Sequence, residues 1–139
     1  PCAVLYHANP SLFVTTEEML ELYQNNDYKI IDARTPARYQ GKQEPIDAVA
    51  GHIPGAINRF HGENLTEKGV FKSVDVLKSE FTELIGSTDT NKVIVYCGSG
   101  VTSCHHLLAM KIAGINGPRL YVGSWSEWIR DPKRPIGLG

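Results

Sequence analysis

The sequence lacks any uninterrupted apolar run of the length that a membrane-spanning helix needs. Its start lacks the basic and then apolar segments of a secretory signal. An excess of charge of one sign is also missing, because 14 Lys and Arg stand against 15 Asp and Glu, for a net charge of −1. A field this weak attracts neither nucleic acid nor a membrane surface. We therefore expect a cytoplasmic protein without either partner.

Cysteine is scarce as well, and the three that occur are Cys2, Cys97 and Cys104. An odd count without a CxxC pair argues against a disulfide framework and against a zinc site. We expect a reducing compartment, no metal and no organic cofactor. Internal repeats and low-complexity segments are absent too, so the length of 139 residues predicts one domain, over residues 12–139. Residues 1–11 are interpreted as a linker or a cloning remnant.

The pattern that remains alternates strands with helices, since short apolar runs alternate with segments of helical apolar spacing. The expected strands cover residues 28–33, 92–97 and 119–123, and the expected helices cover residues 15–25, 73–85, 102–113 and 124–130. A short helix should begin at Pro36, and residues 41–72 should be irregular. Ser124 or Ser126 should cap the last helix. This order predicts an α/β doubly wound fold, with a central parallel sheet and helices on both faces.

The stretch VIVYCGSGVTSC, residues 93–104, places Cys97 where the most strand-like segment ends and a helix is expected to begin. Ligands bind beyond the carboxyl ends of the strands in such parallel sheets. Gly98 and Gly100 allow unusual backbone conformations, and several N–H groups can then surround the sulfur as an anion-binding nest. The partial positive charge of the helix start adds to this effect and favours the thiolate. Because of these neighbours, we favour a reactive thiol over the alternative of a buried structural cysteine.

The spacing after Cys97 argues against one class of cysteine enzyme. A cysteine-dependent phosphatase needs an arginine six residues after its nucleophile, where the guanidinium group binds the phosphate with two parallel hydrogen bonds. Ser103 occupies that position here. Phosphatase or arsenate reductase activity is therefore not expected.

Four stretches together resemble a known family. The loop CGSGVT, residues 97–102, is similar to the active-site loop of rhodanese-type sulfurtransferases, and most similar to that of the 3-mercaptopyruvate type. The other stretches are DARTPARYQG (32–41), GHIPGAIN (51–58) and YVGSWSEW (121–128). They occur in the family's order over nearly the whole chain. The resemblance implies a rhodanese-like domain, the catalytic second domain of a tandem protein whose inactive first domain is missing from this chain.

The same resemblance assigns a role to each residue of the expected site. Cys97 would take a sulfane sulfur from a small-molecule donor, become a persulfide and pass the sulfur to a thiol or cyanide. Ser99 would polarise the donor or the thiol. The other expected contacts are Gly98, Gly100, Val101 and Thr102 around the persulfide, and Arg34 and Arg38 on the donor's carboxylate. For Arg34, a simple ion pair with Asp32 is the alternative.

The loop also bears on the choice of donor. Relatives that prefer thiosulfate carry basic residues inside it, as in C-R-K-G, whereas this chain has the uncharged Gly98 and Ser99. A monoanionic keto acid suits an uncharged loop better than a doubly charged inorganic donor does. We therefore favour 3-mercaptopyruvate, and keep a thiosulfate-using rhodanese and a non-enzymatic persulfide relay as alternatives. The intact loop argues against an inert scaffold.

Several other residues have both a structural and a chemical interpretation. An imidazole group can act as a base near neutral pH, but we expect His52 and His61 to order loops instead. Cys104 is expected to be buried inside its helix, not to resolve the persulfide into a disulfide. Trp125 and Trp128 share one helix face and are expected to pack the last helix onto the sheet.

Overall fold

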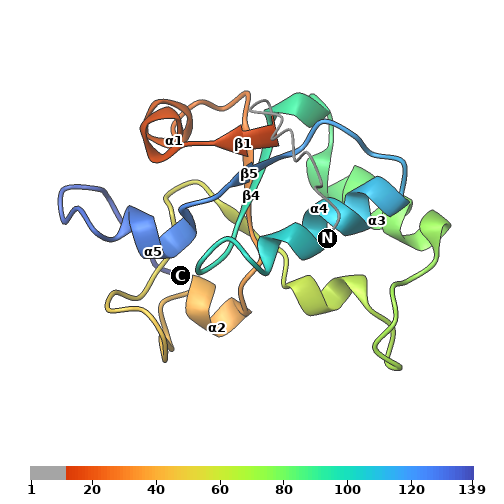
Figure 1. Cartoon of the computed structure of the whole chain (residues 1–139), viewed down its shortest axis with the longest axis horizontal. Helices are drawn as coiled ribbons and strands as arrows, with labels where there is room; N and C mark the ends of the chain where they lie inside the picture. Colours follow the sequence, from red (N-terminus) through yellow and green to blue (C-terminus); the bar gives the residue numbers. More distant parts are fainter. Residues whose placement is uncertain (1–11) are drawn as a thin grey trace, which may run out of the picture.

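The computed structural model describes residues 12–139 and is built on a five-stranded sheet in which all neighbouring strands are parallel. The strands are β1 (Phe13–Val14), β2 (Lys29–Asp32), β3 (Ile57–Asn58), β4 (Val93–Tyr96) and β5 (Arg119–Tyr121). Their order across the sheet is β1-β5-β4-β2-β3, so β4 lies in the middle (Figure 1). The segment interpreted as a linker, residues 1–11 with Cys2, lies outside the described residues.

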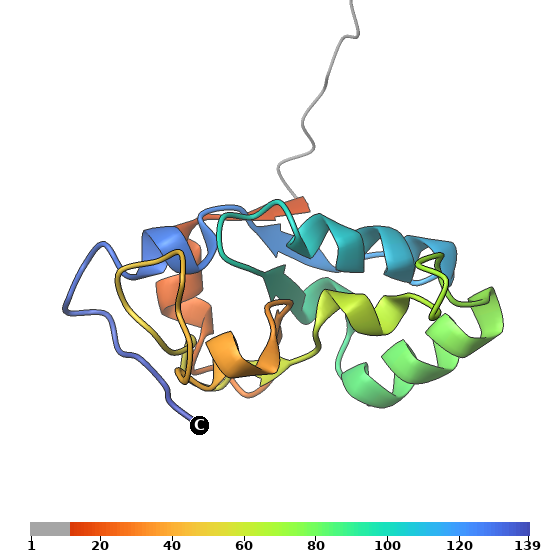
Figure 2. The ribbon, with the colours of Figure 1, turned by 90° about the horizontal axis from the view of Figure 1, so that it is seen from below.

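The helices follow the order that the sequence predicts. They are α1 (Thr16–Leu22), α2 (Pro36–Tyr39), α3 (Val74–Ile85), α4 (Ser103–Ile112) and α5 (Ser124–Trp128), with the 3-10 turns η2 (His61–Asn64) and η3 (Thr90–Lys92). In Figure 2, α1 and α5 lie on one side of the strands, and α3 and α4 lie on the other. The prediction of a parallel sheet with helices on both faces is therefore confirmed.

The central strand shows why both faces are covered. All four residues of β4 are buried, and their side chains alternate between the two faces of the sheet. Ile94 and Tyr96 pack into the apolar cluster that includes Trp125 and Trp128 of α5, both fully buried. Val95 packs on the opposite face, among residues of α3 and α4. The predicted packing role of the two tryptophans is confirmed, and the sheet is apolar on both faces, as parallel sheets require.

Local signals in the sequence set most helix boundaries. Thr15 and Glu18 form the expected capping box at the start of α1, since each side chain accepts the backbone N–H of the other residue. Ser73 caps α3 in the same way, through the N–H of Val76. The sequence did not predict β1 or β3, because two residues are too short to show a strand pattern. β3 and the turn η2 lie within residues 41–72, which were expected to be irregular. Helix α1 also ends at Leu22, earlier than expected.

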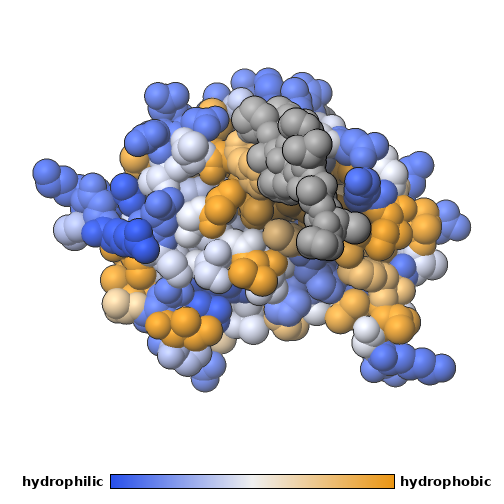
Figure 3. Space-filling model, in the orientation of Figure 1, coloured by the Kyte–Doolittle hydropathy of each residue, from blue (hydrophilic) through white to orange (hydrophobic). Residues whose placement is uncertain are grey.

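The described surface mixes apolar and hydrophilic residues. On the face seen in Figure 3, apolar residues form several separate patches among hydrophilic ones. Val101, Leu108 and Ile112, from α4 and the loop before it, are among the large apolar residues that are exposed. None of the helices within residues 12–139 has the length and apolar character needed to cross a bilayer.

Candidate active site

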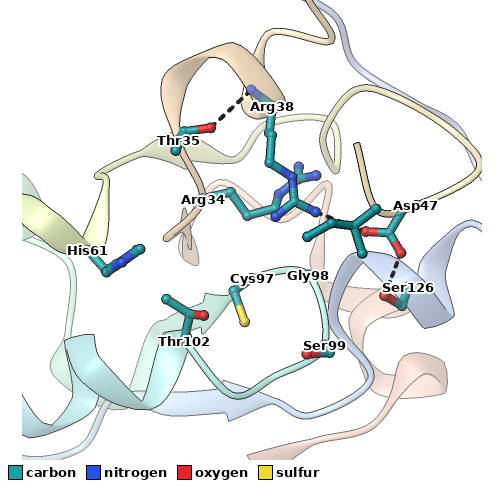
Figure 4. Close-up of a pocket in the computed structure, with 11 residues that line it drawn as sticks. Arg34, Thr35, Arg38, Asp47, His61, Cys97, Gly98, Ser99, Thr102 and Ser126 are labelled. Carbon is teal, nitrogen blue, oxygen red and sulfur yellow. Dashed lines mark hydrogen bonds and ion pairs between the residues drawn. The ribbon is translucent and has the colours of Figure 1, made fainter. Parts of the chain in front are cut away.

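Cys97 follows β4 directly, so it lies at the carboxyl end of the central strand, where the loop 97–102 leads into α4. The residue is 1% exposed, and it lines a cavity of about 160 Å³ (Figure 4). The backbone N–H of Gly100 donates to Sγ, with a distance of 3.1 Å between nitrogen and sulfur. This N–H group and the positive end of the α4 dipole are placed to stabilise negative charge on the sulfur.

Three hydrogen bonds fasten the cysteine loop to α5. The N–H of Cys97 donates to Ser124 Oγ at 3.2 Å. In the other direction, the carbonyl of Cys97 accepts the N–H of Trp125 at 3.0 Å, and the carbonyl of Gly98 accepts the N–H of Ser126 at 2.8 Å. The backbone on both sides of the sulfur is therefore fixed by a segment that lies far along the chain.

These contacts explain why α5 begins differently from the expectation. Neither Ser124 nor Ser126 is its N-cap, because that position is Gly123, which has no side chain to cap the helix. The Ser124 hydroxyl instead accepts from Cys97 and donates to the Tyr121 carbonyl at 2.9 Å. Ser124 thus links the ends of β4 and β5. Its φ of 54° lies in the left-handed region, a strained conformation of the kind found at functional sites.

Gly98 and Gly100 are needed for different reasons. Gly100 has a φ of 90°, and a Cβ at this position would lie 2.5 Å from the carbonyl oxygen of Val122. Gly98 has no positive φ, but a Cβ there would lie 3.3 Å from Nη2 of Arg38. The unusual backbone expected for both glycines is therefore found at Gly100, whereas Gly98 leaves room for an arginine side chain.

Most residues that the sequence singled out surround the same cavity (Figure 4). Six of the eight line it, namely Arg34, Arg38, Cys97, Gly98, Ser99 and Thr102. Gly100 contributes through its N–H group on the sulfur. Val101 is 74% exposed, and its side chain lies outside the cavity.

The cavity also contains residues that sequence reasoning missed. Thr35, Ile46, Asp47 and Ser126 line it. Thr35 and Ser126 lie within two of the stretches that carry the family resemblance, but the sequence assigned neither to the site, and Ile46 and Asp47 belong to no motif. They come from the N-cap of α2, the irregular segment that follows α2, and helix α5, and only the fold brings these parts together. One signal was available, because a long irregular segment such as 41–72 is often functional, and it supplies Ile46 and Asp47.

Arg34 lies at the edge of the cavity, and each nitrogen of its guanidinium group has a protein partner. Nη2 donates to Asp32 Oδ2 at 2.7 Å and to the Gly51 carbonyl at 2.6 Å, while Nε also donates to Asp32. Nη1 donates to Glu44 at 3.2 Å. Burial acts to lower the pKa of Arg34, but the hydrogen bond and charge of Asp32 outweigh it and raise that pKa. The structure therefore contains the ion pair with Asp32 that was the alternative for this arginine.

Arg38 is the more accessible arginine, with 16% of its side chain exposed. Nη2 donates to Asp47 Oδ2 at 3.1 Å, and Nε lies 3.2 Å from both oxygens of Glu44. Glu44 also accepts the N–H groups of Ile46 and Asp47. Burial acts to raise the pKa of Glu44, but these N–H groups and Arg38 outweigh it and lower that pKa. Glu44 is thus ionised at neutral pH.

His61 lines the cavity on the side away from Asp47 (Figure 4). Its Nδ1 lies 3.2 Å from the carbonyl oxygen of Ala33, and because a carbonyl only accepts, Nδ1 carries a hydrogen. The ring therefore orders a loop, as expected, and also forms part of the cavity wall. His52 has only the structural part, since its ring stacks on Tyr39 and bonds the carbonyl of that residue.

Behind the loop, a buried histidine holds α4 in place. Nε2 of His106 lies 2.6 Å from the Arg59 carbonyl, and Nδ1 lies 2.8 Å from Nδ2 of Asn64. Because the carbonyl accepts and the amide nitrogen donates, the ring is neutral, with its hydrogen on Nε2. Burial lowers the pKa of His106 to about 4. The position of α4, and of the loop that precedes it, thus depends on a neutral histidine.

Cys104 is exposed, so the expectation that it is buried was wrong. In the first turn of α4, the buried residues are Ser103 and His106 instead. The Cys104 sulfur lies 3.5 Å from the Gly100 carbonyl oxygen and lines a second cavity of about 340 Å³. Cys97 lines the first cavity and not the second, so the two sulfurs face different spaces.

Comparisons with known proteins identify the family of the chain. A model of the rhodanese-like domain matches residues 15–131. A probable 3-mercaptopyruvate sulfurtransferase of Pseudomonas aeruginosa is 48% identical over 110 residues, which are 79% of this chain and 39% of that protein. A putative thiosulfate sulfurtransferase of Mycobacterium tuberculosis is 44% identical over 110 residues, which are 79% of this chain and 38% of that protein. The chain therefore spans about two fifths of the length of these curated relatives.

A solved structure gives the same result for the fold. The Tum1 protein from Saccharomyces cerevisiae superposes with a TM-score of 0.77 at 28% identity, over 92% of this chain and 47% of that one. The predicted rhodanese-like α/β fold is thus confirmed. Because the family model covers far more than half of the residues, the chain belongs to the rhodanese-like domain family.

Proposed function

We propose that this domain is a sulfurtransferase whose nucleophile is Cys97. The observation that carries the proposal is the position of its sulfur, which lies on a cavity wall, 3.1 Å from the Gly100 N–H and at the start of α4. Such surroundings stabilise a thiolate and an anionic persulfide. The relatives named above, 3-mercaptopyruvate and thiosulfate sulfurtransferases, support the same reaction class.

The reaction consists of two displacements at Cys97. In the first, the thiolate attacks the sulfur of 3-mercaptopyruvate, and the bond between that sulfur and carbon breaks. Pyruvate leaves as its enolate and takes up a proton, while the transferred sulfur stays on Cys97 as a persulfide. In the second, an acceptor thiolate or cyanide attacks the outer sulfur. The S–S bond then breaks, and Cys97 leaves as the thiolate.

The donor binds between the cysteine loop and the two arginines. Arg38 contacts its carboxylate, because a guanidinium group matches two carboxylate oxygens and this side chain is the accessible one. Arg34 supports this contact, since both arginines bind Glu44. Ser99 lines the cavity and polarises the donor's carbonyl or thiol. The loop residues from Gly98 to Thr102 surround the persulfide.

The favoured donor is 3-mercaptopyruvate, since the loop around the sulfur carries no charge that compensates a dianion. A thiosulfate-using rhodanese is the second candidate. It is favoured by the 44% identical relative, which is named a putative thiosulfate sulfurtransferase. A non-enzymatic persulfide relay is the third, and it differs in accepting sulfur without efficient turnover.

The partners follow from the same proposal. The curated relatives are longer than this chain, so we propose that an inactive rhodanese domain precedes it in the whole protein and helps to close the site. The other partners are the small-molecule donor and a thiol or cyanide acceptor. The cytoplasmic location, and the lack of nucleic-acid and membrane partners, stay predictions from the sequence.

A steady-state assay of the purified chain tests the proposal, with 3-mercaptopyruvate and thiosulfate supplied separately together with a thiol acceptor. We expect faster turnover with 3-mercaptopyruvate and none in Cys97→Ser, whereas Cys104→Ser serves as the matched control and keeps activity. Turnover that survives in Cys97→Ser contradicts the proposal. A preference for thiosulfate favours the second candidate, and one transferred sulfur without turnover favours the relay.

A further inference from the structure

Asp47 places a carboxylate group in the wall of the Cys97 cavity (Figure 4). Its Oδ2 accepts from Nη2 of Arg38 at 3.1 Å, and its Oδ1 accepts the Ser126 hydroxyl at 2.7 Å. The side chain is 9% exposed. A Cβ on Gly98, the residue after the nucleophile, would lie 3.7 Å from Oδ2. A negative charge is therefore held close to the place where a donor must approach the sulfur.

The charges around the cavity are unbalanced in the negative direction. Asp47 and Glu44 both engage the guanidinium group of Arg38, and Asp32 engages that of Arg34. Three carboxylates thus oppose two guanidinium groups, and the cysteine loop adds no charge. Water is largely excluded from these groups, so the repulsion between Asp47 and a bound anion is weakly screened and grows with the charge of that anion.

We propose that Asp47 makes the cavity select sulfur donors of low negative charge, so that monoanionic keto-acid thiols are used and dianions such as thiosulfate are rejected. This inference rests on the proposed function, and it assigns donor selectivity to a residue outside the cysteine loop. The hydrogen bonds of Asp47 go to Arg38 and Ser126, not to the sulfur. Its influence therefore falls on the binding of donors and not on the displacement at Cys97.

Asp47→Asn removes the charge and keeps the shape. An amide can accept from Arg38 and donate to the Ser126 hydroxyl, so both hydrogen bonds are retained. We expect the ratio of kcat/KM for thiosulfate to that for 3-mercaptopyruvate to rise about tenfold. The reason is that the repulsion by the Asp47 carboxylate, which the substitution removes, is stronger for the dianion than for the monoanion. The change should appear mainly in KM for thiosulfate.

Alkylation of Cys97 gives a second readout that needs no sulfur transfer. Iodoacetate is an anion, and iodoacetamide is a neutral reagent of nearly the same shape. In a Cys104→Ser background, Asp47→Asn should raise the rate with iodoacetate relative to the rate with iodoacetamide by about fivefold, for the same electrostatic reason. A purely structural role of Asp47 changes both rates alike and leaves this ratio where it was.

Two matched variants complete the test. Asp47→Glu keeps the charge and should leave both ratios near their wild-type values. Asp89→Asn removes an exposed carboxylate that lines a different cavity, and it should change neither ratio.

The outcomes separate this inference from the proposed function. If Asp47→Asn changes both donors by the same factor and leaves the alkylation ratio unchanged, the selectivity proposal is overturned. If neither donor gives turnover with the wild-type chain but the alkylation ratio rises in Asp47→Asn, charge selection by Asp47 stands and the proposed function fails.

Discussion

The two sides of the Cys97 cavity are built from different chemical groups. On one side, the loop 97–102 offers backbone and small uncharged side chains, with the Gly100 N–H on the sulfur. On the other side, the segment 34–47 offers two arginines, each paired with carboxylates. We call these the loop side and the charged side. In our proposal, the loop side fixes and stabilises the nucleophile Cys97, and the charged side determines which anionic donors reach it.

On this proposal, the reactivity of the sulfur and the selection of the donor have separate structural origins in this domain. The contacts that hold the loop side are mostly backbone hydrogen bonds to α5, so they depend little on the identity of individual side chains. The charged side depends on particular ion pairs, and one substitution there changes its net charge.

Arg34→Ala should disrupt the charged side most. Asp32 is fully buried, and the substitution leaves its carboxylate without the guanidinium group, which costs about 3–5 kcal/mol of unfolding free energy. Urea unfolding measures this loss. Arg38→Ala is the comparison, since that side chain is more exposed and should cost clearly less. Equal losses for the two variants contradict the account of the charged side.

Gly100→Ala should disrupt the loop side most. The new Cβ would meet the Val122 carbonyl oxygen at 2.5 Å, and the φ of 90° disfavours any residue with a side chain, so we expect a loss of about 3 kcal/mol. Gly69→Ala is the matched control, because Gly69 has a φ of 77° with nothing within 4 Å, and it should lose only about 1 kcal/mol. Equal losses of unfolding free energy in Gly100→Ala and Gly69→Ala would show that the close approach of residue 100 to the Val122 carbonyl does not affect stability.

Acid should weaken the loop side through His106. Its pKa is lowered from 6.5 to about 4 in the folded protein, so the unfolded chain takes up a proton first as the pH falls. Stability is then fully present above pH 6.5 and is lost progressively toward pH 4. Between pH 7 and pH 5, we expect the unfolding free energy to fall by about 2 kcal/mol from this group.

Comparison with variants isolates this contribution. His105 also has a lowered pKa, from burial and from the neighbouring charge of His61, so it acts in the same direction. His106→Gln should flatten the dependence of the unfolding free energy on pH more than His105→Gln does. Identical slopes for the wild-type chain and His106→Gln would show that the neutral form of His106 does not hold α4.

Cys104→Ser should have the smallest effect of all. Its side chain is exposed and faces a different cavity from Cys97, so we expect stability to change by no more than about 0.5 kcal/mol, with unchanged sulfur transfer. Unfolding and steady-state assays check both. A large loss of activity would mean that Cys104 takes part in the chemistry despite this geometry.

The loop side was predictable from the sequence because its residues are contiguous. A strand, a cysteine, two glycines and a helix start follow one another in VIVYCGSGVTSC, and strand ends fix the position of such a loop in a parallel sheet. The prediction of a serine cap for the last helix failed, because the hydroxyl of Ser124 had two possible hydrogen-bond partners. Ser124 is a good capping residue by type, but its hydroxyl is taken up by the backbone of Cys97.

The charged side was only half predictable. The resemblance pointed to Arg34 and Arg38. No pattern in the sequence predicts the ion pair between Asp47 and Arg38, because the segment between these two residues is irregular. Cys104 shows the same limit for burial. The apolar residues of a helix show which of its faces is buried only when they repeat at helical spacing. Helix α4 is short and mixes apolar with polar residues, so its sequence does not define the buried face.

The most direct test of the central claim is the mass of the protein after brief treatment with 3-mercaptopyruvate in the absence of an acceptor, followed by mapping of the modified peptide. The account predicts the addition of one sulfur atom on Cys97, its absence in Cys97→Ser, and its removal when a thiol or cyanide is added. An unmodified Cys97, or a sulfur found on Cys104 instead, would contradict the account.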